Sequence, residues 1–194
     1  MYTLRAAADL INDRRAVGDR AGAEELARQT HDLCRESGAP DVLLFTVLVN
    51  LASVLRIADR PDLAISHDDQ ARRGLIKIHG DRHLFTLAAN INYASDLAAL
   101  PGRLAEAIEL GRKTLDNCRL YLGDDHPDTL MAGANLSKDE VAAGDSGTEM
   151  DPRGERRLAG VLRGYERTLT LEHPEARAAA QRTRLTAEIE PYDL

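Results

Sequence analysis

The chain has 194 residues, of which 43% are hydrophobic and 4% aromatic, and its formal net charge is −7. The hydrophobic content is enough for a packed core and excludes a chain that is disordered throughout. With so few aromatic residues, the core is built from Leu, Ala, Val and Ile, which suits close-packed helices better than a sheet. The acidic balance disfavours nucleic-acid binding, because proteins of that class usually carry a basic surface.

The N-terminal part has the spacing of two amphipathic helices. Apolar residues recur on one helical face over residues 2–17 and again over 23–36. A turn containing glycine separates these two stretches, and a second turn, which contains glycine and proline, follows the second stretch. We therefore expect the chain to begin with a helical hairpin.

Residues 41–57 are apolar on almost every side, and they predict a helix that is covered by other elements. A run of this length is too long for an ordinary strand. Its polar exceptions are spaced by four, three and three residues, so they line one narrow stripe: Thr46, Asn50, Ser53 and Arg56. The helix predicted next, over 62–78, is much more polar. We interpret its charged run His67-Asp68-Asp69 as solvated surface.

The same pairing of an apolar helix with a more polar one is predicted to recur. Apolar helices are expected at 84–100 and 127–143, with an outer helix at 103–121 between them. One asparagine segment returns in the three apolar helices at steps of 42 and 43 residues: Asn50-Leu51-Ala52-Ser53, Asn92-Tyr93-Ala94-Ser95 and Asn135-Leu136-Ser137-Lys138. A fixed period of this size is typical of a solenoid, in which each helix pair buries its apolar face against the next pair.

The last quarter of the chain is less regular. Residues 144–154 are polar and rich in turn formers, and we expect a loop there. Helices are predicted over 155–171 and over 174–189, the second as a polar cap on the array, before an extended tail at 190–194. As one domain, the chain divides into a degenerate leading hairpin, three repeats and a cap with its tail: residues 1–39, 40–79, 80–122, 123–171 and 172–194.

Two further segments complete a pattern that resembles a known family. They are Leu122-Gly123-Asp124-Asp125-His126-Pro127-Asp128-Thr129-Leu130 and Gly102-Arg103-Leu104-Ala105-Glu106-Ala107. Together with the asparagine segments, they resemble the tetratricopeptide repeat family, in the longer variant of about 42 residues that occurs in kinesin light chains and many actinobacterial proteins. The resemblance implies an all-α, right-handed solenoid of about four antiparallel helix pairs with a C-terminal capping helix. It also implies a bacterial, non-catalytic protein that binds other proteins.

The repeated asparagines are the candidate binding residues. In the family that the chain resembles, the first helices of successive repeats line a concave groove. Asparagine is a poor residue for a helix interior, and its amide can both donate and accept hydrogen bonds. A row of asparagines in the groove can therefore hold the backbone of an extended peptide. The candidate groove residues are Thr46, Asn50, Ser53, Arg56, Asn92, Ser95, Asn135 and Lys138. The alternative is that the asparagines hold neighbouring helices together.

Motifs for chemistry are weak in this sequence. His79 and His83 flank a glycine at a repeat junction and do not form a recognised metal motif. Cys34 and Cys118 stand alone in helical patterns and are expected to be reduced thiols. The acidic residues near position 125 suit the start of a helix. We expect no catalytic residues, no metal and no cofactor.

The expected function is a non-catalytic adaptor that binds a protein or peptide in the concave groove. The alternative is a structural or regulatory array that self-associates as a homo-oligomer, or that docks on a signalling ATPase or a peptide-modification system. An enzyme built on helical repeats is the third and least favoured class. The sequence has no run of 18 apolar residues and no signal-peptide core at its start. We therefore expect a cytoplasmic protein without a membrane contact.

Overall fold

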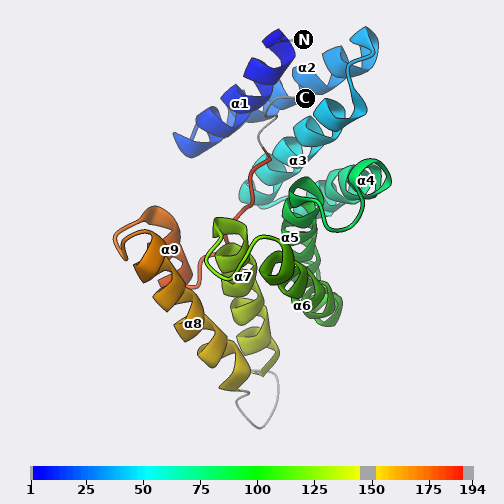
Figure 1. Ribbon diagram of the computed structural model, residues 1–194. Helices are drawn as coiled ribbons and strands as arrows, with labels where there is room; N and C mark the ends of the chain where they lie inside the picture. The colour runs from blue at the N-terminus through cyan, green and yellow to red at the C-terminus, as the bar shows by residue number, and fades with distance from the viewer. Residues whose placement is uncertain (1, 145–151, 190–194) are drawn as a thin grey trace. The chain divides into compact units, whose positions relative to one another are not determined.

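The computed structural model describes residues 2–144 and 152–189, and these contain nine α-helices and no strand (Figure 1). The all-α class predicted from the sequence is confirmed. The helices are α1 (Tyr2–Ala16), α2 (Arg20–Ser37), α3 (Asp41–Ile57), α4 (Pro61–His79), α5 (Leu84–Ala99), α6 (Leu104–Tyr121), α7 (Pro127–Gly144), α8 (Pro152–Thr168) and α9 (Pro174–Ala180).

Helix ends follow local chemistry that is visible in the sequence. Gly38 closes α2 with a φ of 63°, a left-handed conformation that glycine adopts without strain. At the other end of α2, the Asp19 carboxylate accepts a hydrogen bond from the Gly22 amide. Pro61 occupies the first turn of α4, where its missing N–H is not needed. These signals explain why the predicted ends of most helices lie within a few residues of the observed ones.

Two predictions in the last quarter of the chain were wrong. Helix α8 begins at Pro152, three residues before the predicted start, so the predicted loop at 144–154 is shorter than expected. The rest of that loop, residues 145–151, and the predicted tail at 190–194 lie outside the described residues. The predicted helix at 174–189 ends at Ala180, and no regular secondary structure follows it up to Ile189.

The helix α9 stops because the backbone turns at Arg182, whose φ is 55°. The amide of Thr183 then donates to the Ala178 carbonyl at 2.8 Å, a bond of the kind that closes a helix C-terminus. Beyond this point alternate side chains are buried, at Leu185, Ala187 and Ile189. Burial with a period of two is the pattern of an extended chain and not of a helix. Residues 182–189 are called the C-terminal segment below.

The described chain groups into two compact units. Unit 1 contains residues 2–96 and 188–189, and unit 2 contains residues 97–187. In unit 1, α3 packs against α1, α2 and α4, and its side chains form much of the core. The helices approach closely through alanines, including Ala52 on α3 and Ala64 on α4, both fully buried. The Phe45 ring lies against Gly74 of α4, where any Cβ would come within 2.1 Å of it.

In unit 2, α7 packs between α6 and α8, and α9 contacts both α7 and α8. Two glycines allow α7 and α8 to approach closely. A Cβ at Gly164 would lie 2.3 Å from Leu130, and one at Gly133 would lie 2.7 Å from Val161. The absence of these two side chains therefore sets the distance between the helices.

Candidate functional site

The first predicted stripe, on α3, is buried in unit 1. Thr46 and Ser53 are 0% and 2% exposed. Their hydroxyls donate to carbonyls one turn earlier in the same helix, with oxygen–oxygen distances of 3.0 Å for Thr46 and 2.9 Å for Ser53. Such bonds satisfy a hydroxyl inside a helix without any outside partner. These two side chains are therefore accounted for by α3 itself.

Asn50 connects two helices of unit 1. It is 1% exposed, and its Nδ2 atom donates to the Ala8 carbonyl of α1 at 3.1 Å. This is the geometry of the alternative interpretation, in which asparagines hold neighbouring helices together. Asn92 and Ser95 of α5 are likewise fully buried, and the Ser95 hydroxyl donates to the Ile91 carbonyl at 3.0 Å.

Arg56 lies in a buried ion cluster and not on an open groove. Its Nη2 atom lies 2.5 Å from the Asp68 carboxylate of α4, and its Nε atom lies 2.5 Å from the Asp96 carboxylate of α5. Both carboxylates are fully buried, and the Arg56 side chain is 8% exposed. The prediction that Asp68 is solvated was therefore wrong. The cluster of Arg56, Asp68 and Asp96 ties three helices together.

The charges of this cluster do not balance, since one guanidinium lies between two carboxylates. Burial raises the pKa of Asp68 well above its usual value, the charge of Asp96 raises it further, and Arg56 opposes both effects. The shift follows from the cost of placing a second negative charge in a buried site. One signal in the sequence could have revealed the cluster: Asp96 is a charged residue within a helix that is otherwise uncharged.

Asn135 of α7 binds the backbone of an extended segment. Its Nδ2 atom donates to the Leu185 carbonyl at 2.9 Å, and its Oδ1 atom accepts from the Leu185 amide at 2.9 Å. Asn135 is 5% exposed, and Leu185 is 7% exposed. Asparagine thus pairs with both polar groups of one residue, as a neighbouring strand would.

Charged side chains flank this contact. Arg184 forms an ion pair with Asp139, which lies one turn after Asn135 on α7, and one of its nitrogen–oxygen distances is 3.3 Å. Burial raises the pKa of Asp139, and Arg184 opposes the increase. Burial and then the charge of Arg184 lower the pKa of Lys138, and the charge of Asp139 opposes both effects. We call the surface formed by Asn135, Lys138 and Asp139 the Asn135 face.

The eight predicted residues therefore do not form one open surface. All except Lys138 are buried or, in the case of Arg56, have a buried side chain. The structure brings Asn135 and Lys138 together at the C-terminal segment. Ligand binding by the full set stays a prediction. The sequence did not reveal the role of Asp139 and Leu185, because it predicted a helix where the segment is extended.

Comparison with known proteins identifies a family that the middle of the chain matches. Residues 43–119, which span most of α3 and all of α4, α5 and nearly all of α6, match the family model described as tetratricopeptide repeat. This stretch of the chain is therefore similar to tetratricopeptide repeats. The resemblance stated from the sequence is thus confirmed. None of the curated proteins matches the sequence.

Solved tetratricopeptide structures share the fold. The TPR-like repeats of a Podosopora anserina putative kinesin light chain superpose with a TM-score of 0.70 at 21% identity, covering 93% of this chain and 83% of that chain. A variant of those repeats with one substitution has a TM-score of 0.71 at 21% identity, and the match covers 93% of this chain and 82% of that chain. BtubC (BKLC) from P. vanneervenii has a TM-score of 0.59 at 16% identity, covering 92% and 79%. The fold is therefore an all-α, tetratricopeptide-like solenoid.

Tetratricopeptide arrays are generally non-catalytic scaffolds for protein–protein interaction, so the matched repeats and the shared fold are compatible with such a role in general terms. Both cysteines are buried, and burial raises the pKa of the Cys118 thiol to about 12. Over residues 2–144 and 152–189, no group of three or more His, Cys, Asp or Glu side chains gathers in a way that could hold a metal ion. In the same part of the chain, no helix is both long and apolar enough to cross a membrane.

Proposed function

We propose that this protein is an adaptor that holds an extended segment of a partner protein on the Asn135 face. The observation that carries the proposal is the pair of hydrogen bonds between the Asn135 amide and the backbone of Leu185. Because both bonds involve backbone atoms, they do not depend on the side chain at that position. Backbone pairing of this kind supplies affinity in many extended-peptide complexes, and side-chain pockets supply specificity.

The side chains around this contact indicate which sequences fit. Arg184 pairs with Asp139, and the next residue, Leu185, is buried. A partner segment with a basic residue followed by an apolar one reproduces both contacts.

The C-terminal segment occupies the Asn135 face in the isolated chain, so a partner must displace it. The segment contains no helix, and only α9 lies between it and α8. It can therefore leave without the loss of a helical turn. A tethered segment acts at an effective concentration on the order of millimolar, which weakens the apparent affinity of any competitor.

The test uses a labelled peptide with the sequence of residues 181–194 as the probe. The full chain carrying Arg184→Glu and Leu185→Asp has a loosened segment, and we expect it to bind the peptide more tightly than the unaltered chain in fluorescence anisotropy. Adding Asn135→Ala to the loosened chain should weaken this binding by about tenfold or more, through the loss of two hydrogen bonds.

The matched control is Asn50→Ala in the same loosened chain, because Asn50 is also a buried asparagine but bonds a helix carbonyl. We expect this control to keep the peptide affinity of the loosened chain. Equal affinity for the peptide with and without Asn135 would show that the Asn135 face does not hold the segment, and the proposal would fail. Circular dichroism of each variant checks that the helices remain.

Self-association is a second candidate function, favoured by the absence of helix in the segment that lies on the Asn135 face. The same contacts form if the segment of one copy binds the Asn135 face of another, as in domain swapping. Sedimentation velocity would then show a mass that increases with concentration, and the change of Arg184 and Leu185 would abolish the increase. A constant monomer mass over the range would exclude this exchange.

A further inference from the structure

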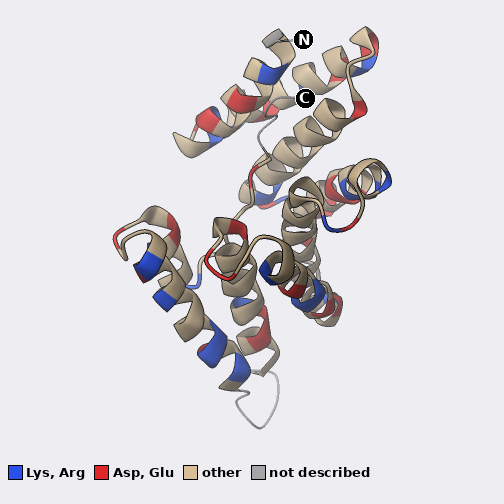
Figure 2. Ribbon diagram, in the orientation of Figure 1, with Lys and Arg blue, Asp and Glu red and all other residues tan. Residues whose placement is uncertain are grey.

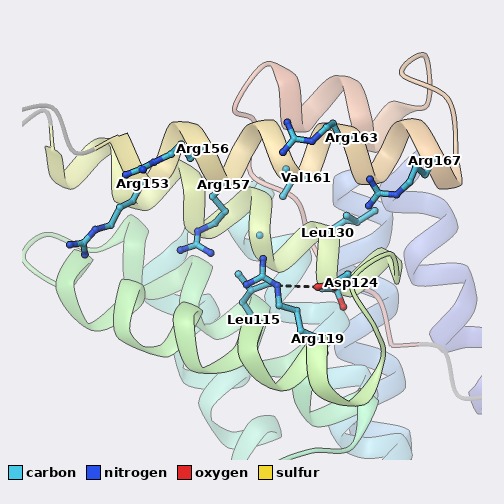
Figure 3. Close-up of a pocket in the computed structure, with 13 residues that line it drawn as sticks. Leu115, Arg119, Asp124, Leu130, Arg153, Arg156, Arg157, Val161, Arg163 and Arg167 are labelled. Atoms are coloured by element: carbon cyan, nitrogen blue, oxygen red, sulfur yellow. Dashed lines mark ion pairs between the residues drawn. The ribbon is translucent and has the colours of Figure 1, made fainter.

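Unit 2 also contains a recess, which is distinct from the Asn135 face. It has a volume of about 510 Å³ and lies over α7 between α6 and α8. Figure 3 shows that arginines of α8, together with Arg119 of α6, border this recess. Six arginines line it in total: Arg119, Arg153, Arg156, Arg157, Arg163 and Arg167. We call it the arginine groove.

The helix α8 supplies most of this charge. Five of its 17 residues are arginine and two are glutamate, and Figure 2 shows the resulting row of basic residues along it. Arg153, Arg156, Arg163 and Arg167 are separated by three, seven and four residues, which are helical repeats, so these four form one stripe with Gly160 in its middle. At a rise of 1.5 Å per residue the stripe is about 21 Å long, which matches an extended peptide of about six residues.

The groove is open in the middle of the stripe because position 160 is glycine. A Cβ added at Gly160 would have a single neighbour within 4 Å, the Nη2 atom of Arg163 at 3.9 Å. This contrasts with Gly133 and Gly164 on the packed sides of α7 and α8, where a Cβ would clash. Gly160 therefore does not serve helix packing, and it leaves space that a ligand can occupy.

Part of the positive charge in the groove is not neutralised by the chain itself. Within the described residues, no carboxylate forms an ion pair with Arg156 or Arg163. Arg156 donates to the Pro152 carbonyl at 3.3 Å, a neutral acceptor. Arg119 pairs with Asp124 at 3.3 Å, but the Asp124 side chain is 81% exposed. An exposed pair of this kind contributes little stability and can be exchanged for a ligand carboxylate.

A second observation points to a ligand. Thr129 is one of the lining residues, and its buried hydroxyl has no hydrogen-bond partner in the described part of the chain. Thr129 is 3% exposed. Buried hydroxyls nearly always have a partner, so this donor is available for an acceptor that enters the groove. The floor beside it is apolar, with Leu130 and Val161.

We propose that the arginine groove binds a short acidic segment of a partner protein in an extended conformation. Carboxylates of the segment pair with Arg156 and Arg163, since guanidinium and carboxylate groups match in planar, two-bond geometry. The Thr129 hydroxyl donates to the same segment. The net charge of −7 repels long polyanions such as nucleic acids, whereas a short segment interacts mainly with the local field within a Debye length of about 8 Å. This site shares no residue with the Asn135 face and does not rest on the function proposed above.

The test is fluorescence anisotropy of the full chain with a labelled hexaglutamate peptide and a hexaglutamine control. We expect hexaglutamate to bind and hexaglutamine not to bind. The double change Arg156→Glu and Arg163→Glu should weaken hexaglutamate binding by about tenfold or more, because each lost charge-assisted pair is replaced by repulsion. The double change Arg73→Glu and Arg82→Glu is the control for net charge, since these side chains are 74% and 66% exposed and do not line the groove.

Gly160 allows a second test that does not remove any arginine. Gly160→Glu places a carboxylate inside the groove and should weaken hexaglutamate binding, whereas Gly160→Gln adds nearly the same volume without charge and should weaken it much less. Both residues favour a helix more than glycine does, so the fold is retained.

Three outcomes would overturn the proposal. The first is that hexaglutamate binds no more strongly than hexaglutamine. The second is a loss of binding on changing Arg73 and Arg82 that equals the loss on changing Arg156 and Arg163, which indicates a diffuse charge effect. The third is that a labelled hexathymidylate binds through the same arginines more tightly than hexaglutamate does, which would assign the groove to nucleic acid.

Discussion

Replacing Arg56 by Met should destabilise unit 1 more than any single surface change. The substitution keeps most of the apolar stem of the side chain but removes the cation that contacts both Asp68 and Asp96, whose carboxylates are fully buried. The two carboxylates would then lose the guanidinium between them. Breaking a buried ion pair by removing one partner costs about 3–5 kcal/mol. We expect a loss of that size in the free energy of unfolding at pH 7.

Urea unfolding followed by circular dichroism at 222 nm measures the loss, with the slope on urea concentration as a check that the same surface is exposed. Arg73→Met is the matched control, because Arg73 pairs with Asp69 on the surface of α4 and such pairs contribute at most about 1 kcal/mol. Adding Asp68→Asn and Asp96→Asn to the Arg56 variant should restore much of the loss. Equal losses for the Arg56 and Arg73 variants would refute the argument that the buried cluster holds the helices together.

Three further predictions concern pH, one asparagine and two glycines. The pKa of Asp68 is raised above its usual value of 3.8 in the folded protein. The stability that protonated Asp68 contributes is therefore fully present below pH 3.8 and is lost as the pH rises through the folded-state pKa. In urea unfolding between about pH 4 and pH 7, the Asp68→Asn variant should gain stability relative to the unaltered chain as the pH rises. Asn50→Ala removes the hydrogen bond to the Ala8 carbonyl and leaves a small cavity, and it should cost about 1–3 kcal/mol in the same assay, whereas no change would mean that this bond is not formed in solution. Gly133→Ala should destabilise the protein by about 1–3 kcal/mol, because the new Cβ would lie 2.7 Å from a valine of α8, but Gly160→Ala should stabilise it by about 0.5–1 kcal/mol. The same sign for both glycine variants in thermal unfolding would contradict the packing described for α7 and α8.

The helices of this protein could be predicted from the sequence because local signals agree with the tertiary structure. Residues 41–57 are the clearest case, since α3 has those ends and is buried as its apolar composition requires. Periodicity, proline and glycine act within a few residues of each helix end. The period of the asparagine segments likewise indicates the stacking of similar units, so the fold class could be inferred from the sequence alone.

The partners of polar side chains could not be predicted, because they come from distant parts of the chain. Asn50 bonds residue 8, and Asn135 bonds residue 185. The sequence indicated three equivalent asparagines, but two of them have different kinds of partner, a helix carbonyl and an extended backbone. The end of the chain was misjudged for a related reason. Alanine and arginine favour a helix over 174–189, but alternate burial of Leu185, Ala187 and Ile189 stabilises an extended conformation that local propensity does not encode.

The most direct test of the central claim is the hydrogen exchange rate of the Leu185 amide, measured by NMR. The account predicts slow exchange in the unaltered chain, because this amide donates to the buried Oδ1 atom of Asn135. It also predicts that Asn135→Ala accelerates the exchange of Leu185 while the amides of α3 keep their protection. Exchange of the Leu185 amide at the rate of an unfolded peptide in the unaltered chain would show that the Asn135 face does not hold an extended backbone, and would contradict the account.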